Sequence, residues 1–440
     1  MHRTHNRNTV RYFILITILL SFLFFTTDFG LIDIQKTAIV LAAGIDRNGE
    51  DFIITSQIAI PKSSDQGKST NAVQIVSRGK TVAEAFEEIN AKTGWYPKLV
   101  FCNLILLGED TAKQNVFDAL DYFLLDEYLS DNCLVAACNG KAKDILNAAT
   151  LVDDASSAAI EKVLSQHAEQ VGTVFTSTLR TFAMGYYADN ACGMLPLIKL
   201  QNQQEPNGET TQNTKEKPSQ EKNSQGEQSS QGETSQQGNQ NQDQSQEQSQ
   251  GQSQGQQSGQ SQSGKSGEEQ NKPVFSAGET ALFKHGKRVG TLNTEETFAA
   301  NAVLNKLRLA PYSVTTKNTT CTLTIKQNAS KVKLKVAKNG MACLKINLDL
   351  TAGLLDYAKA LPVEDIEDAG DVPPGAFDAA QRKLAGEILA LFEKTRALDC
   401  DVFSVRDRFR KTGNPSFSQY ESSLLSNTVA EVTVHFKNIR

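Results

Sequence analysis

The stretch AIVLAAGIDRNGEDFIITSQIAI, residues 38–60, contains two apolar runs on either side of a polar turn signal. Asp46-Arg47-Asn48-Gly49 is polar and ends in glycine, a pattern typical of a tight turn between antiparallel strands. The flanking runs at 38–45 and 52–60 are apolar and contain six isoleucines, which favours extended backbone. The sequence therefore predicts a β-hairpin at the start of the folded part.

Strands and helices are expected to alternate after this hairpin. Thr81 and Glu84 form a capping-box pattern at a helix start, and Gly94 is placed to end that helix. An apolar run, Met194-Leu195-Pro196-Leu197-Ile198, follows near the end of this half. We expect strands at 73–77, 99–107 and 134–137. Helices are expected after the strand at 99–107, ending at about 125, and at 141–147, 157–171 and 178–187. This order predicts a mixed α/β domain.

The carboxy-terminal half has a different pattern. A hairpin is predicted from strands at 279–283 and 288–292, and Asn293 with Glu296 predicts a capped helix start. Leu344, Ile346 and Leu348 alternate with polar residues, as in a strand with one buried face. Further strands are expected at 320–326, 331–336, 342–350 and 430–436, with a long helix at 375–398. An antiparallel sheet packed against two helices, in α+β style, fits this order.

A Gln/Ser/Gly-rich tract at 201–273 separates the two halves. It has almost no apolar residues, so it cannot bury enough surface to offset the entropy of ordering, and we expect it to be disordered. Its ten acidic and five basic residues account for the whole formal net charge of −5, so the remainder is close to neutral. That balance lacks the basic footprint of a nucleic-acid-binding protein. The predicted domains are therefore 34–200 and 274–440, with a linker at 201–273.

The first residues predict export. Arg3, Arg7 and Arg11 precede an apolar run at 12–25, and positive charge stays on the cytoplasmic side of a membrane. We expect a cytoplasmic arm at 1–11, a membrane anchor or signal segment at 12–31, and the bulk of the chain outside. A cleaved signal peptide is the alternative, but Phe24–Asp28 offers no small-residue cleavage site, which favours the anchor.

Motifs for catalysis or metal binding are not found in the sequence. The five histidines form no HExxH pattern and have no cysteine at zinc spacing, and there is no GxSxG, Walker or GxGxxG motif. We therefore predict no catalytic, cofactor-binding or metal-binding residues, and no cofactor. The seven cysteines contain no CxxC, and the favoured interpretation is that they are buried free thiols. Cys133 and Cys138 should point to opposite faces of one strand.

Several stretches in order resemble the Ger(x)C spore germination family. Residues 38–46 resemble that family's opening strand, and 73–88 and 99–108 resemble the elements that follow. Residues 133–146 resemble its apolar strand and lysine-containing helix start. Beyond the tract, 281–290 resembles its second hairpin and 399–415 its segment after the long helix.

The resemblance implies a non-enzymatic subunit of a spore nutrient-germinant receptor. Such proteins act with A-type and B-type membrane subunits at the inner spore membrane. Recognition of the small-molecule germinant is generally attributed to those partner subunits. Family members usually carry a lipid-bearing cysteine, and Thr27 stands where it would be expected, so no lipidation is predicted. An extracytoplasmic small-molecule binding protein is the alternative function; a cell-wall enzyme and an adhesive surface protein rank below it.

A candidate partner contact lies at the helix start after Asn139-Gly140. Lys141, Lys143 and Asp144 cannot all face the core of such a short helix, so some of them must be exposed. An ordinary solvated helix start explains the same pattern. The residues are therefore a hypothesis for a partner contact.

Overall fold

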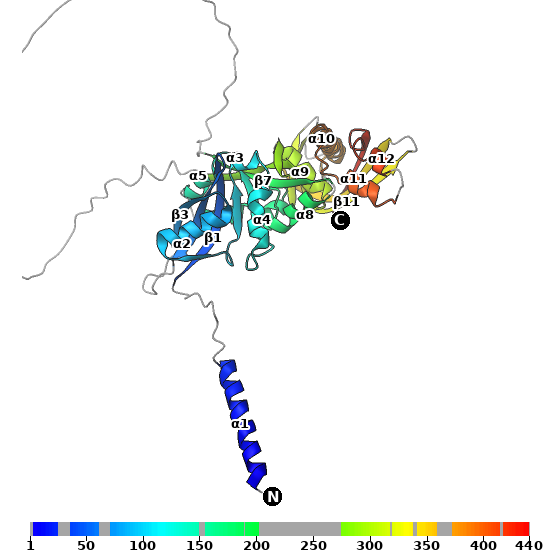
Figure 1. Ribbon diagram of the computed structural model, residues 1–440. Coiled ribbons are helices and arrows are strands. Elements are labelled where there is room, and N and C mark those ends of the chain that lie inside the picture. Colours follow the sequence, from blue (N-terminus) through cyan, green and yellow to red (C-terminus); the bar gives the residue numbers. More distant parts are fainter. Residues whose placement is uncertain are drawn as a thin grey trace, which may run out of the picture. The chain divides into compact units, whose positions relative to one another are not determined.

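Two β-sheets with helices packed on them organise the chain in the computed structural model (Figure 1). Elements of both halves of the sequence contribute to the larger sheet. The structure describes residues 3–24, 36–60, 71–148, 155–188, 190–201, 274–316, 319–337, 341–358, 372–413 and 417–439.

The first sheet has nine strands in the order β3-β2-β1-β5-β6-β7-β8-β9, with β4 also paired to β1. The central pairs β1–β5, β5–β6 and β6–β7 are parallel, and the pairs on either side of them are antiparallel. The predicted opening hairpin is confirmed, with Asn48 paired to Asp51 across the turn. The strands are β1 (Thr37–Asn48), β2 (Asp51–Ile60), β3 (Asn71–Gly79), β4 (Tyr96–Lys98), β5 (Leu104–Leu107), β6 (Leu134–Cys138), β7 (Cys192–Gln201), β8 (Val274–Lys284) and β9 (Lys287–Leu292).

Helices cover both faces of this sheet. Strand β5 is an example of a strand that is buried on both faces. Its residues Ile105 and Leu107 belong to the apolar core on one face of the sheet, and Leu104 and Leu106 belong to the core on the other face. A parallel strand buried on both faces is apolar throughout. The helices on the first face are α2 (Val82–Thr93), α4 (Phe117–Leu125) and α8 (Leu179–Tyr187), and those on the second are α5 (Ala142–Asn147) and α6 (Ser156–Val163).

The second sheet has four strands in the order β10-β11-β12-β13. Its first two pairs are antiparallel, but β12 and β13 are parallel, so the prediction of an antiparallel sheet was wrong for that pair. The chain returns to the same end of the sheet through α10, and this long connection permits parallel pairing. The elements are β10 (Ala310–Thr315), β11 (Thr320–Val336), β12 (Ala342–Tyr357), β13 (Thr428–Asn438), α9 (Thr294–Val303), α10 (Ala376–Ala397), α11 (Val405–Arg410) and α12 (Phe417–Tyr420).

The predicted hairpin at 279–292 forms, as β8 and β9, but it extends the first sheet and not the second. Strand β8 pairs with β7 from Cys192↔Lys284 to Gln201↔Val274, across the ends of the Gln/Ser/Gly tract. The segments on either side of that tract thus form one compact unit. Residues 202–273, where disorder was predicted, lie outside the described residues.

Other differences from the prediction have local causes. The run at 99–107 is a strand only from Leu104, because the Cys102 N–H closes a turn on the Leu99 carbonyl at 2.8 Å. The helix expected up to 125 is broken where the Val116 N–H donates to Gly286 O at 2.9 Å. The helix expected at 157–171 divides into α6 and α7 (Gln166–Gln170), and the strands expected at 320–336 merge into β11. The short helix α3 (Glu109–Ala112) and strand β10 complete the described elements.

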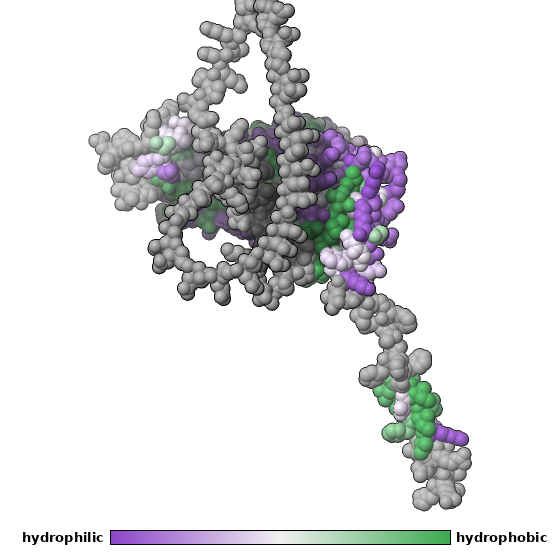
Figure 2. All heavy atoms as spheres, turned by 90° about the vertical axis from the view of Figure 1, so that its left-hand side faces the viewer, coloured by the Kyte–Doolittle hydropathy of each residue, from purple (hydrophilic) through white to green (hydrophobic). Residues whose placement is uncertain are grey.

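Helix α1 (Arg3–Phe24) carries the predicted apolar run. Its apolar side chains at 12–16 and 18–20 are exposed, and Figure 2 shows them gathered along the helix. None of the helices in the described ranges combines the length and apolar character that crossing a membrane requires. Thr27, where no lipidation was predicted, lies outside the described residues.

Candidate functional site

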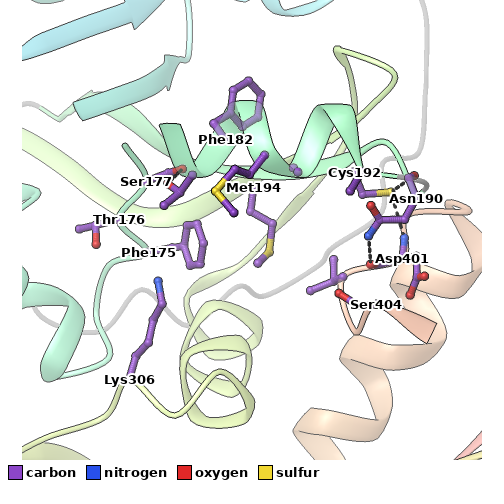
Figure 3. Close-up of a pocket in the computed structure, with 16 residues that line it drawn as sticks. Phe175, Thr176, Ser177, Phe182, Asn190, Cys192, Met194, Lys306, Asp401 and Ser404 are labelled. Carbon is purple, nitrogen blue, oxygen red and sulfur yellow. Dashed lines mark hydrogen bonds between the residues drawn. The ribbon is translucent and has the colours of Figure 1, made fainter. Parts of the chain in front are cut away.

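A cavity of about 350 Å³ lies where the two halves of the sequence meet (Figure 3). Helix α8 and the start of β7 form one wall, and the loop between α10 and α11 forms another. Lys306, after α9, lies across the opening from this loop in the view of Figure 3. The lining side chains that carry the argument below are Phe175, Asn190, Cys192, Lys306, Asp401 and Ser404.

The backbone around this cavity is unusual. Ala191, Asp399 and Ser404 have φ values of 47°, 50° and 54°, in the left-handed region that residues other than glycine rarely occupy. His285, at the end of β8, has a φ of 48°, and its N–H donates to the Ala191 carbonyl at 2.8 Å. Backbone held in this region costs about 1–3 kcal/mol per residue and gathers at functional sites.

A buried polar network joins the two halves at this point. The Asn190 side-chain amide donates to the Asp401 carbonyl at 3.1 Å, and the Asp401 N–H donates to Cys192 Sγ at 3.1 Å. The Cys192 thiol in turn donates to the Asn190 carbonyl at 3.0 Å. Asn190 Oδ1 is buried and has no hydrogen-bond partner among the described residues.

The Asp401 carboxylate organises the start of α11. Its two oxygens accept the N–H groups of Val405 at 2.7 Å and Arg406 at 2.8 Å, both of which lack partners inside the helix. Burial raises the pKa of Asp401 above its usual value, and these two N–H groups act in the opposite direction. Both oxygens of this carboxylate therefore bind the backbone at the start of α11 and fix the loop between α10 and α11.

Two cations lie beside this network. Lys284 from β8 pairs with the Asp399 carboxylate and also donates to the Asp399 carbonyl at 2.6 Å. Arg406 donates to the same carboxylate at 2.6 Å. Across the cavity, Lys306 pairs with Glu169 at 2.5 Å, and its ammonium lies 4.2 Å from the centre of the Phe175 ring. The Lys306–Glu169 pair joins the two halves, whereas Lys284, Asp399 and Arg406 all belong to the carboxy-terminal half.

The predicted contact residues lie at the start of α5, with Lys141 as its N-cap, and do not belong to the residues that line the cavity. Lys141, Lys143 and Asp144 are all exposed. The helix start beneath them is held by Asp46 at the end of β1, whose carboxylate accepts the N–H groups of Ala142 at 2.8 Å and Lys143 at 2.9 Å. Burial raises the pKa of Asp46, against the effect of these bonds. That these exposed residues contact a partner stays a prediction.

The cavity residues were not foreseen from the sequence. Asn190 and Asp401 are each a single polar residue in an ordinary loop, and they lie far apart in the chain. Cys192 and Cys400 were counted only as buried thiols. All seven cysteines are free, and six are buried. Cys133, directly before β6, and Cys138, at its end, enter different cores, as predicted. Among the described residues, no three His, Cys, Asp or Glu side chains form a cluster that could hold a metal ion.

Comparison with known families identifies both halves of the chain. Residues 31–200 match the family described as "Spore germination protein N-terminal domain". Residues 278–440 match the family described as "Spore germination B3/ GerAC like, C-terminal". The two matches leave out the tract between the halves.

Two individual proteins show more limited similarity. "Spore germination protein B3" of Bacillus subtilis (strain 168) is 31% identical over 119 residues, which are 26% of this chain and 31% of that protein. The match thus spans less than a third of that protein's length. The solved structure described as "Crystal Structure of the GerBC protein" is 15% identical, with a TM-score of 0.45 over 90% of this chain and 97% of that one.

Proposed function

This chain belongs to the Ger(x)C family of spore germination proteins, and we propose that it is a non-enzymatic, membrane-tethered subunit of a nutrient-germinant receptor. Family membership gives it a role in spore germination, and germinant receptors are complexes associated with the spore membrane. The finer proposal is that it acts through contacts with A-type and B-type membrane subunits, which bind the germinant. The observation that carries it is that the family matches cover both halves of the unit.

The polar groups of the junction cavity support a non-enzymatic role. Asp401 is occupied by the backbone of α11, and Lys306 is occupied by Glu169. A general base or a nucleophile has to reach its substrate within hydrogen-bond distance. The Asp401 carboxylate is instead engaged in fixing the start of α11, and Lys306 in a contact between the two halves.

The test is to delete the gene in a spore former without paralogues and to complement it with variants. We expect the deletion to abolish nutrient-triggered germination and to leave non-nutrient triggers working. Normal nutrient germination in the deletion strain would defeat the receptor proposal.

Helix α5 is the proposed contact with the partner subunits. Reversing the charge at Lys141 and Lys143 together should then reduce nutrient germination. The matched control is reversal of Lys331 and Lys333, which are exposed on β11. Equal germination in both double variants would remove the contact and leave the receptor role standing.

We further propose that residues 12–31 hold the protein at the inner spore membrane, with the bulk on the extracytoplasmic face. Leu15 and Leu19 on α1 are exposed by 62% and 66%, a large apolar surface to leave in water. Replacing both with Arg should release or misplace the protein, since a central Arg costs ~2.5–3.5 kcal/mol on insertion. Fractionation of spore membranes measures this, with replacement of both by Phe as the apolar control. Full retention of the Arg variant would contradict the tether.

A second candidate function is binding of a small extracytoplasmic molecule, favoured by the cavity at the junction. Asn190 Oδ1 is a buried acceptor without a partner among the described residues, which is the kind of group a ligand could satisfy. Titration calorimetry of the full chain in detergent with amino acids and sugars distinguishes the two. Tight binding that is lost in Asn190→Ala would favour this second function.

A further inference from the structure

Two cysteines from opposite halves of the chain meet beside the cavity. Cys192 is the first residue of β7, and Cys400 lies in the loop after α10. The Asp401 nitrogen, which donates to Cys192 Sγ at 3.1 Å, is bonded to the carbonyl carbon of Cys400. Two backbone bonds of about 1.3 and 1.5 Å separate that nitrogen from Cys400 Cα, so the Cys192 sulfur lies within about 6 Å of Cys400 Cα.

The Cys400 sulfur points back toward the same place. It donates to the Phe283 carbonyl at 3.6 Å, and Phe283 on β8 is paired with Gly193, the neighbour of Cys192. Each cysteine also follows directly after a residue with left-handed backbone, Ala191 before one and Asp399 before the other. The hydrogen bonds of Cys192 to Asp401 and of Cys400 to Phe283 thus place the two thiols near each other across the junction of the halves.

The surroundings of Cys192 suit the attacking thiol of an exchange reaction. The neighbouring Cys400 thiol lowers the pKa of Cys192, and the Asp401 N–H and the Lys284 ammonium act in the same direction against burial. Cys192 also lines the cavity, which gives a small reagent a route to its sulfur. A thiolate, and not a thiol, is the nucleophile in thiol–disulfide exchange.

We propose that Cys192 and Cys400 are a covalent modification site, where a disulfide made by exchange with a small aliphatic disulfide ties the two halves of the chain together. The Cys192 thiolate attacks one sulfur of the oxidant, forms a mixed disulfide and releases the first thiol of the oxidant. Cys400 then loses its proton and attacks the Cys192 sulfur, which releases the second. The two protein thiols are oxidised, the oxidant is reduced to two thiols, and these take up the two protons.

A second pair of cysteines provides an internal control. The Cys102 thiol lies close enough to Cys133 to raise the pKa of Cys133, with burial acting in the same direction. Both residues precede the Gln/Ser/Gly tract, so a bond between them cannot join the two halves. Neither belongs to the residues that line the cavity.

The experiment places a site-specific protease sequence in the tract at 203–271 of the full chain. The purified protein in detergent is treated with cystamine, a small aliphatic disulfide, cleaved, and run on a non-reducing gel. We expect the two halves to migrate together until a reductant is added, and to separate in Cys192→Ser and in Cys400→Ser. Cys102→Ser should behave like the unmodified chain. Halves that separate after cystamine treatment of the unmodified chain would overturn the proposal.

The same bond is then sought in the native protein. Spores are lysed into an alkylating agent, and the chain is mapped by mass spectrometry without reduction. A linked peptide pair containing Cys192 and Cys400 is the expected result, while alkylation of both would show that the disulfide is not a native modification. The presence of a suitable oxidant rests on the extracytoplasmic location proposed above. Because the cystamine assay needs neither a membrane nor germination, its result stands apart from the receptor proposal.

Discussion

Helices α5 and α11 both begin at a buried aspartate that accepts two backbone N–H groups, but the aspartate and the helix are far apart in the sequence in one case and adjacent in the other. Asp46 lies on β1 and caps a helix 96 residues further along the chain, whereas Asp401 caps a helix that starts four residues later. Asp46 is buried against Gly108, Ala142 and Lys143, which all belong to the amino-terminal half. Asp401 is bonded through its own backbone to Asn190 and Cys192 of the other half.

The difference separates two tasks. Asp46 fixes where α5 sits on the first sheet, so the exposed Lys141 and Lys143 are presented at a set position. Asp401 shapes a loop whose backbone is the link between the halves. One carboxylate therefore acts on the fold of one half, and the other acts on the junction.

Replacing Asp46 with Ala should have the largest effect on stability. The change leaves the N–H groups of Ala142 and Lys143 without acceptors, and each buried unsatisfied donor costs roughly 1–3 kcal/mol. We expect a loss of about 3 kcal/mol in the free energy of unfolding, measured by urea unfolding of the full chain in detergent. Asp46→Asn keeps one acceptor oxygen and should lose less. An Ala variant as stable as the Asn variant would show that the two bonds do not hold α5.

Replacing Asp401 with Ala should cost less, about 2 kcal/mol. Its bonds to Val405 and Arg406 span four and five residues, and such local contacts persist in part in the unfolded ensemble. The same urea series measures it. If Asp401→Ala destabilises the chain more than Asp46→Ala, the sequence separation between the bonded groups does not determine how much the bonds contribute to the free energy of unfolding. The comparison between the two aspartates would then fail.

A glycine beside Asp46 allows the same contact to be broken by crowding. A Cβ at Gly108 would lie 1.9 Å from Asp46 Oδ1, although the backbone there, with φ −62° and ψ 160°, suits alanine. Gly108→Ala should therefore push the carboxylate off α5 and cost about 1–2 kcal/mol, an overpacking effect. The matched control is Gly386→Ala on α10, where nothing lies within 4 Å, and it should be neutral or stabilising. Thermal unfolding midpoints of both variants decide the point.

The features that could be predicted from the sequence are those that depend on residues close together in the chain. The cap at Thr81 and the capping box at Asn293 formed as expected, because each is a local hydrogen-bond pattern. The predicted hairpin also formed, but its turn lies at Gly49-Glu50, because residues 46–48 extend strand β1. The partner of the hairpin at 279–292 was not predictable, since its pairing with β7 depends on a contact across the whole Gln/Ser/Gly tract.

The candidate site could not be predicted for the same reason. Asn190, Cys192 and Asp401 have no shared spacing, and their meeting depends on how two halves pack. The exposed residues on α5 were predictable because a short helix with one apolar face leaves its other positions in solvent. The exposure of the residues at the start of α5 could thus be predicted from the sequence, whereas the contacts between the two halves could not.

The smallest expected effect distinguishes two carboxyl groups at the junction by pH. The Asp399 carboxyl has a pKa below its usual value of 3.8, because its bonds to Lys284 and Arg406 outweigh the effect of burial. Asp401, two residues on, has a pKa above that value because of burial. A lowered pKa in the folded state contributes stability above pH 3.8 that is lost as the pH falls through the folded pKa. A raised pKa has the opposite sign: its ionised form costs stability as the pH rises from 3.8 through the folded pKa.

Asp399→Asn should therefore destabilise the chain at neutral pH and match the unmodified chain in strong acid. Because the Asp399 side chain is 59% exposed, solvent and salt screen its ion pairs, and the difference should stay below about 1 kcal/mol. Urea midpoints of both proteins at about pH 7 and about pH 3 measure it, and added salt should shrink the gap at neutral pH. Asp401→Asn should show the reverse trend, becoming less destabilising as the pH rises. A gap for Asp399→Asn that widens toward acid would mean that burial, and not the pairs with Lys284 and Arg406, governs this carboxyl as it governs Asp401.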